Sequence, residues 1–183
     1  EEEWRKISAP MRQKKLIPLF DFAYQGFGER VEKVRLALEI FLQDGHEMLV
    51  AYSCSKNFSL CRQRVGALLA VSENKEAKGG VSSQIKSIIR GLYSNPPGYG
   101  STIAAEILKT PSLKEEWKKE LETMRRRLIQ AREMFVEKLS LKTSDFAFLS
   151  QQKGMFSFTG IKKEAAERLR KDFGVYILDT GRV

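Results

Sequence analysis

The sequence predicts an α/β fold in which short buried strands of a mostly parallel sheet alternate with helices. Three observations support this prediction. Short apolar runs occupy residues 16–20, 48–52 and 65–71, and polar residues or glycine bound them, which is typical of buried parallel strands. A helical spacing of apolar residues separates the first two runs, and this order implies a right-handed parallel unit. A longer helical pattern follows in the second half of the chain.

Three helices are expected in the first half of the chain. Residues 1–14 place Trp4, Ile7 and Met11 on one face, as an amphipathic helix does. Residues 34–42 form the crossover helix, and Asp44-Gly45 ends it because glycine suits the position after a helix C-terminus. The spacing of isoleucines and Leu92 predicts a third helix over residues 85–92. This helix stops at residues 95–98, where two prolines prevent its continuation.

The longest predicted helix opens at Pro111 and Ser112. Ser112 and Glu115 have the spacing of a capping box. Apolar residues then recur every three, four or seven positions over residues 113–139, and Lys, Arg and Glu crowd the opposite face. Because a helix this long can bridge two domains, we expect part of a large domain at residues 1–111 and a smaller α+β part at residues 112–183.

The smaller part is expected to hold strands and one further helix. Residues 146–149 and 155–158 alternate like half-buried strands. A helix ends at Gly174, and a last strand covers residues 175–178. Neither end of the chain resembles a domain boundary, so we expect that segments are missing at both ends.

The composition is that of a folded protein. Of the 183 residues, 42% are hydrophobic and 30% are charged, which is enough to bury one core or parts of two. No apolar run approaches the length of a membrane span. The formal net charge of +9 permits nucleic acid as a partner, but acidic residues stand among the basic ones, so neither nucleic acid nor membrane is expected as a partner.

Cysteine and histidine usage argues against a metal site. Cys54 and Cys61 form no metal or redox motif, and two free thiols suit a reducing compartment, taken here as the cytoplasm with the mitochondrial matrix not excluded. His46 is the only histidine, and we expect neither a metal site nor a Ser-His-Asp arrangement around it. No metal ligands are therefore predicted.

Polar clusters follow two of the predicted strands. Residues 21–27 offer a carboxylate and a phenol, and residues 53–58 offer an amine and two hydroxyls, with arginines following. In open parallel sheets, ligands bind beyond the carboxyl ends of the strands. This set of groups suits a phosphorylated pyridine aldehyde, which needs an amine for a Schiff base, a carboxylate for its ring nitrogen and donors for its phosphate.

Five blocks of sequence resemble class I pyridoxal-phosphate-dependent aminotransferases of the aspartate aminotransferase type. They are Asp-Phe-Ala-Tyr-Gln-Gly-Phe (21–27), Ser-Cys-Ser-Lys-Asn-Phe (53–58) with the following Arg-Val-Gly, Arg-Gly-Leu-Tyr-Ser-Asn-Pro-Pro (90–97), Gly-Met-Phe-Ser-Phe (154–158) and Gly-Arg-Val (181–183). The blocks occur in family order across the whole chain. The resemblance implies the fold type I of these transferases, with a three-layer α/β/α large domain and a smaller α+β C-terminal domain, and it implies that the chain is the C-terminal half.

The resemblance also implies the cofactor contacts. Lys56 would carry pyridoxal 5'-phosphate as a Schiff base and later shuttle a proton. Asp21 would pair with the pyridinium nitrogen, and Tyr24 would bond the ring hydroxyl. A further group would hold the phosphate: Ser53, Ser55 and Arg64.

Substrate contacts follow from the same resemblance. Arg182 would bind the α-carboxylate, with bidentate geometry. Arg90 would bind the distal carboxylate in the active site of the other subunit of a homodimer. Asn95 would orient that region, and Phe156 would line the substrate pocket. The expected partners are therefore dicarboxylic amino acids and 2-oxo acids.

Three residues depart from the family pattern. Ser59 and Cys61 stand where glycine and tyrosine are common, and Thr180 stands where serine is common. These changes put substrate preference in doubt more than chemistry.

The leading functional interpretation is ping-pong amino transfer between aspartate and 2-oxoglutarate. Transamination of tyrosine or phenylalanine is an alternative in the same class, because it needs only that Arg90 swing aside. A non-catalytic basic binding protein is a third interpretation that the net charge permits. The chain alone is expected to be inactive, because the family's remaining cofactor contacts belong to the N-terminal half.

Overall fold

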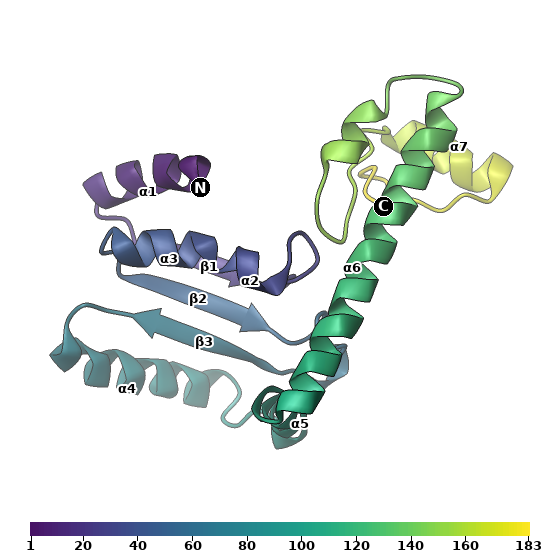
Figure 1. The fold of residues 1–183 in the computed structure, drawn as a ribbon. Coiled ribbons are helices and arrows are strands. Elements are labelled where there is room, and N and C mark those ends of the chain that lie inside the picture. The colour runs from purple at the N-terminus through teal and green to yellow at the C-terminus, as the bar shows by residue number, and fades with distance from the viewer. The chain divides into compact units, whose positions relative to one another are not determined.

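The chain folds into two compact units (Figure 1). The computed structural model describes residues 1–183, apart from the side chain of Glu32. Unit 1 comprises Glu1–Gly26 and Arg30–Lys119, and unit 2 comprises Phe27–Glu29 and Glu120–Val183. The division falls inside helix α6 (Pro111–Ser140), whereas the sequence suggested the start of that helix.

Unit 1 holds a small sheet and most of the helices. Its elements in chain order are α1 (Glu2–Gln13), β1 (Leu19–Phe22), α2 (Val31–Val34), α3 (Leu36–Gln43), β2 (Met48–Ser53), the 3-10 helix η1 (Cys61–Gln63), β3 (Gly66–Val71), α4 (Lys75–Leu92) and α5 (Gly98–Lys109). In Figure 1, α1 and α3 lie above the sheet and α4 lies below it. The alternation of strands and helices predicted for this half is confirmed.

The sheet is mixed, so the prediction of a mostly parallel sheet is wrong for this chain. Strands β1 and β2 are parallel, with Phe22 opposite Tyr52, as the crossover helix requires. Strands β2 and β3 are antiparallel, with Ser53 opposite Gly66. A parallel connection needs a crossover, usually a helix, that returns the chain to the start of the sheet. Only η1 separates these strands, so the chain turns back at the same edge.

Aromatic packing joins α1 and α3 to the sheet. Phe41 is buried, and its ring meets Phe20 edge-on at 5.0 Å and Trp4 at 6.4 Å. Met48 is buried in the same cluster, and Met11 packs against it. Of the three residues predicted to share one face of the first helix, Trp4 and Met11 pack against this core, whereas Ile7 is 47% exposed.

A buried polar cluster lies beside this core. Ser8 Oγ donates to Asp44 Oδ2 at 2.5 Å and lies 2.9 Å from His46 Nε2. The sequence predicted no Ser-His-Asp arrangement around His46, yet a serine and an aspartate do lie beside it. The carboxylate bonds the serine rather than the imidazole, and Ser8 is fully buried, so the cluster joins α1 to the turn after α3 and is not a nucleophilic triad.

A second core lies behind the loop that follows β2. Cys54, Phe58 and Ala104 are buried there, and Trp117 at the start of α6 packs against them. Helix α5, which supplies Ala104, was not predicted. It approaches η1 at Gly100, where an added Cβ would lie 2.6 Å from Gln63 Cβ.

Unit 2 is built on α6. Its other elements are the 3-10 helix η2 (Ala147–Gln151) and α7 (Lys163–Phe173). Helix α7 ends as predicted at Gly174, which has a left-handed φ of 64°. Helix α6 begins at Pro111, so Ser112 lies inside the first turn and the predicted capping box is wrong; proline suits this first position.

The three strands predicted in unit 2 are wrong. Residues 147–151 form η2, and residues 175–178 have no regular structure. Residues 155–158 make only a bridge between Phe158 and Arg182, with Ser157 and Val183 exchanging backbone hydrogen bonds. Phe158, in this bridge, is 57% exposed, and Tyr176, in the last of the three predicted strands, is 78% exposed. Alternation alone therefore overstated the strand content.

Of the helices that the structure describes, none combines the length and the hydrophobicity that a bilayer crossing requires.

Candidate active site

The polar clusters of unit 1 meet at one edge of the sheet. Strands β1 and β2 are parallel, so the loops after Phe22 and Ser53 leave from the same edge, and β3 starts there opposite Ser53. Asp21, near the end of β1, accepts a hydrogen bond from Ala23 N at 3.0 Å through Oδ1. This bond turns the chain directly before Tyr24.

The amine of Lys56 lies against the ring of Tyr24. The distance from Lys56 Nζ to the ring centroid is 5.0 Å, which is within the range of a cation–π interaction. The lysine comes from the loop after β2, and the tyrosine comes from the loop after β1. The structure thus brings together two residues that are 32 positions apart and that the sequence had assigned to one site.

The backbone on both sides of Lys56 is buried. Cys54, Ser55, Asn57 and Phe58 are all buried, whereas Lys56 itself is half-buried. Only the lysine side chain therefore emerges from this segment, here called the lysine loop (residues 54–58).

Asn57 joins the two loops, a role that no sequence pattern indicated. Its Nδ2 donates to Tyr52 Oη at 2.8 Å and to Gln25 O at 3.3 Å. Its backbone oxygen accepts a hydrogen bond from Trp117 Nε1 at 2.7 Å. Only 1% of Asn57 is exposed, and its Oδ1 has no hydrogen-bond partner in the part of the chain that the structure describes.

The predicted phosphate-binding residues lie around the start of β3. Ser53 Oγ accepts a hydrogen bond from Ser55 N at 3.2 Å, and Ser55 is buried. Arg64 is exposed, and its Nη1 donates to Cys61 O at 3.0 Å. An added Cβ on Gly66 would lie 2.3 Å from Tyr52 O, so only glycine allows β3 to approach β2 here.

Two non-glycine residues adopt left-handed backbone angles in this region. Ser59 has φ 56° and Arg64 has φ 50°. Such a conformation costs a residue with a Cβ about 1–2 kcal/mol, and strain of this kind often occurs at functional sites. Ser59 is one of the departures from the family pattern, and its φ explains why glycine suits that position.

Burial changes the titration of two residues here. It raises the pKa of the Cys54 thiol, which suits an inert buried thiol rather than a reactive one. Burial also raises the pKa of Tyr52, and the hydrogen bond from Asn57 partly opposes this change. Tyr52 therefore stays a neutral phenol at physiological pH.

Arg90 and Asn95 lie at the end of α4. Arg90 is exposed in the last turn of the helix, and its Nη1 donates to Ser94 Oγ at 2.5 Å. Asn95 follows Ser94, whose φ is 65°, and its backbone N–H bonds Tyr93 O at 2.8 Å. No carboxylate among the described residues pairs with Arg90.

Unit 2 brings Arg182 and Phe156 together. The guanidinium carbon of Arg182 lies 4.7 Å from the centroid of the Phe156 ring. Both residues line an open hollow of about 470 Å³ that Arg170 also borders. Arg170 is paired with Asp179 at 2.8 Å. Arg182 thus presents its charge beside an aromatic wall.

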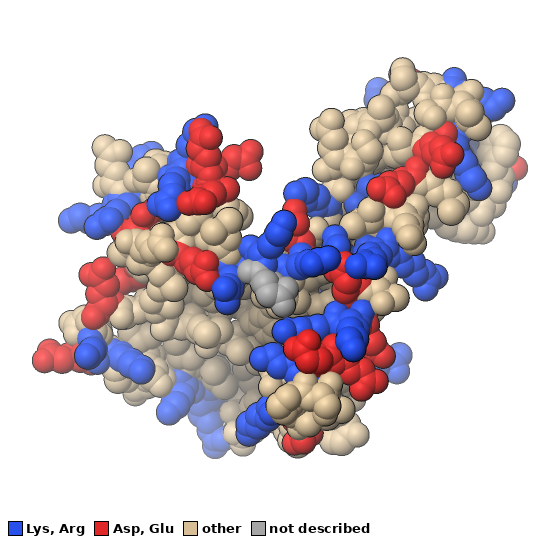
Figure 2. All heavy atoms as spheres, viewed as in Figure 1, with Lys and Arg blue, Asp and Glu red and all other residues tan. Residues whose placement is uncertain are grey.

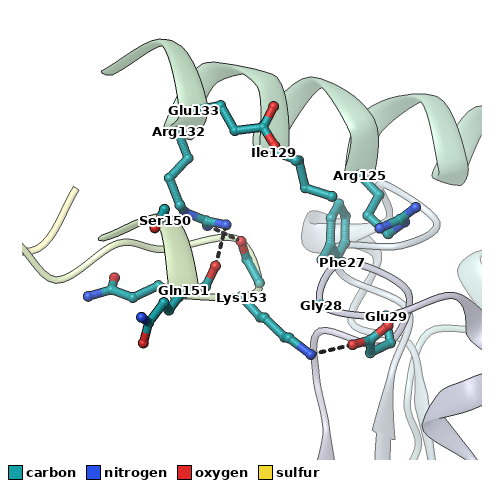
Figure 3. A pocket seen from close by; sticks show the side chains of 12 residues that line it. Phe27, Gly28, Glu29, Arg125, Ile129, Arg132, Glu133, Ser150, Gln151 and Lys153 are labelled. Carbon is teal, nitrogen blue, oxygen red and sulfur yellow. Dashed lines mark hydrogen bonds and ion pairs between the residues drawn. The ribbon is translucent and has the colours of Figure 1, made fainter. Parts of the chain in front are cut away.

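A second hollow in unit 2, of about 300 Å³, is lined by α6 and the segment after η2 (Figure 3). Arg132 donates to Gln152 O and Gly154 O, each at 2.7 Å, and to Ser157 Oγ at 2.9 Å. Lys153 pairs with Glu29 at 2.5 Å. These contacts fix the segment that leads to Phe156.

Charge is mixed on the surface. On the face shown in Figure 2, acidic side chains stand among the basic ones over most of the visible elements. Among the residues that the structure describes, no group of three or more His, Cys, Asp or Glu could hold a metal ion.

Comparisons with known proteins agree on one family. The family model "Aminotransferase class I and II" matches residues 1–183. The chain is 43% identical to an aspartate aminotransferase of Escherichia coli K12, covering 100% of this chain and 46% of that protein. It is 40% identical to an aromatic-amino-acid aminotransferase of Pseudomonas aeruginosa, covering 99% of this chain and 46% of that protein.

Solved structures agree as well. An aromatic-amino-acid aminotransferase from Burkholderia pseudomallei, covalently bound to pyridoxal phosphate, matches with a TM-score of 0.95 and 39% identity, covering 100% of this chain and 46% of that one. The chain therefore belongs to the class I and II aminotransferases. It spans about half the length of the curated relatives it matches.

Proposed function

We propose that the chain is the C-terminal half of an aspartate aminotransferase that transfers the amino group of aspartate reversibly to 2-oxoglutarate, in a ping-pong reaction. The observation that carries this proposal is the Lys56 amine beside the Tyr24 phenol at the carboxyl edge of two parallel strands. An amine in that place can hold pyridoxal phosphate covalently, with loss of water. The names of the similar proteins support the same chemistry.

The residues of unit 1 suit the cofactor. Pyridoxal phosphate, when bound, supplies an aldehyde that condenses with amines and a ring that withdraws electrons. Lys56 Nζ would hold the cofactor and then move a proton to and from the substrate α-carbon. Asp21 would keep the ring nitrogen protonated, and Tyr24 would donate to the ring hydroxyl. The short Tyr24–Lys56 approach supports a shared task for these two side chains.

Ser53, Ser55 and Arg64 would hold the phosphate. Hydroxyl and guanidinium groups are good donors to a phosphate, and the guanidinium adds charge. Ser53 and Ser55 lie beside the start of β3, where Gly66 leaves room for the backbone. The backbone strain at Arg64 supports a functional constraint on its position.

Arg182 would bind the substrate α-carboxylate against the ring of Phe156. Arg90, oriented by Asn95, would bind the distal carboxylate in the site of the other subunit of a homodimer. Among the described residues, the Arg90 guanidinium has only the neutral Ser94 hydroxyl as a partner, and this supports a role in binding a carboxylate. The two free thiols suit a reducing compartment, so we place the protein in the cytoplasm or the mitochondrial matrix.

Aromatic transamination is the second candidate, because the similar proteins include aromatic-amino-acid aminotransferases. The ratio of kcat/KM for aspartate to that for tyrosine, measured on the intact protein, separates the two. The third interpretation, a non-catalytic basic binding protein, would require affinity for DNA that falls steeply with salt.

The test of the proposal is chemical. The intact protein is incubated with pyridoxal phosphate, reduced with borohydride and digested, and the labelled peptide is identified. We expect the label on Lys56. Label on another residue, or none, would overturn the proposal. Residues 1–183 alone are expected to show no turnover, and detectable turnover would contradict that expectation.

A further inference from the structure

The lysine loop is attached to three other parts of unit 1 through Asn57. Its Nδ2 reaches Gln25 O, one residue after Tyr24, and Tyr52 Oη on β2. Its backbone oxygen reaches Trp117 on α6. Asn57 thus connects the loop that carries the lysine to the loop that follows β1 and carries Tyr24.

Trp117 fixes the loop in a second way. Its indole ring stacks on Phe58 with centroids 4.5 Å apart and planes 13° apart, while its N–H donates to Asn57 O. One side chain therefore contacts both residues that follow Lys56. Neither Asn57 nor Trp117 was singled out by the sequence.

The amide of Asn57 is costly as a space-filling group. It is almost fully buried, and its Oδ1 lacks a partner among the described residues, which costs stability relative to an apolar side chain of that size. The orientation of the amide follows from its contacts, since Gln25 O can only accept and so requires the NH₂ group. The useful part of the side chain is therefore its pair of donors.

We propose that Asn57 and Trp117 are positioning residues. They hold the Lys56 amine against Tyr24 and keep the two loops in a fixed position relative to each other. This inference rests on the proposed function of Lys56. Neither residue needs to touch substrate or cofactor. They act through the backbone on each side of Lys56, which is buried and held while the lysine side chain emerges.

The test uses four variants of the intact protein loaded with pyridoxal phosphate. Asn57→Leu removes both donors, and Trp117→Phe keeps an aromatic ring but removes the N–H. Asn74→Ala is the control for asparagine, because Asn74 caps α4 and its loss destabilises unit 1 without touching the lysine loop. Trp4→Phe is the control for tryptophan, since Trp4 packs on Phe20 and Phe41.

Two measurements separate positioning from stability. The first is the pH at which the absorbance of the bound cofactor changes, and the second is the division of the effect between kcat and KM. For Asn57→Leu and Trp117→Phe we expect that pH to move by about half a unit or more. We expect kcat to fall about tenfold or more with KM little changed, because small misplacements of a reacting group are costly. The two controls should lower the thermal midpoint at most.

Each outcome decides one question. If both variants keep the absorbance change and kcat of the unmodified protein, the positioning role is wrong, whatever happens to the thermal midpoint. If Asn57→Leu does not fold, Trp117→Phe decides alone. If the unmodified protein itself carries no cofactor on Lys56, the proposed function fails first, and the positioning role fails with it.

Discussion

Two regions of unit 1 differ sharply in how completely this chain builds them. The lysine loop has four of its five residues buried, held by Asn57 and Trp117. Strand β3 and helix α4, whose last turn carries Arg90, have no buried residue among those described. Leu68 is 50% exposed and Leu92 is 74% exposed. The lysine loop is thus packed within unit 1, and we infer that further polypeptide covers β3 and α4.

The largest expected effect concerns the lysine side. In the intact protein, Lys56→Ala should still bind pyridoxal phosphate. Its kcat should fall by about 10⁴-fold or more, because proton transfer and the covalent link are removed together. Steady-state kinetics with aspartate measure this loss. The control is Lys86→Ala on α4, which should change little. Near-normal turnover of Lys56→Ala would show that the lysine loop is not part of the active site.

The second prediction concerns the other region. Arg90→Asp should lower kcat/KM for aspartate by about 10²-fold or more while affecting tyrosine far less, because it sets like charge against the distal carboxylate. Lys86→Asp makes the same charge change on the same helix and serves as the control. An equal loss of kcat/KM for both substrates would show that Arg90 does not bind the distal carboxylate.

The third prediction concerns the polypeptide that we infer to cover β3, and it is a change in unfolding free energy. If other polypeptide buries Leu68 in the intact protein, Leu68→Ala should cost about 2–5 kcal/mol of unfolding free energy, as core truncations do. If Leu68 stays half exposed, the cost should be within about 0.5 kcal/mol. Denaturant unfolding measures the difference. Leu141→Ala is the control, since Leu141 is 80% exposed in unit 2.

The smallest expected effect concerns the backbone strain at Ser59, directly after the lysine loop. Ser59→Gly should raise the unfolding free energy by about 0.5–1 kcal/mol, because glycine relieves the left-handed φ but is more flexible when unfolded. Ser87→Gly lies inside α4 and should lower stability instead. A loss of stability in Ser59→Gly would mean that the Ser59 hydroxyl makes a contact worth more than the strain.

Local patterns predicted much of the fold. Helix α7 was predicted to its last residue, because amphipathic spacing and Gly174 are local features. Strand β3 was predicted as a strand but with the wrong direction, since an apolar run has the same pattern in either direction. Helix α5 was missed because its role depends on Gly100 packing against η1, which the sequence does not show.

The candidate site also contains residues that local patterns could identify and residues that they could not. The residues near Lys56 and Tyr24 could be named from motifs, and the structure brings these two together. Asn57 could not be assigned a role, because its partners Gln25 and Trp117 lie 32 and 60 positions away. The roles assigned to the other site residues stay predictions until they are tested.

The short segment Phe27–Glu29 belongs to unit 2, although the chain on both sides of it belongs to unit 1. Phe27 is buried there, and Glu29 pairs with Lys153. The polypeptide therefore passes between the units at three points, so no single cut separates them. Residues 120–183 produced alone would lack the phenylalanine and the carboxylate that complete their own packing, and a truncation study of that unit must supply this tripeptide.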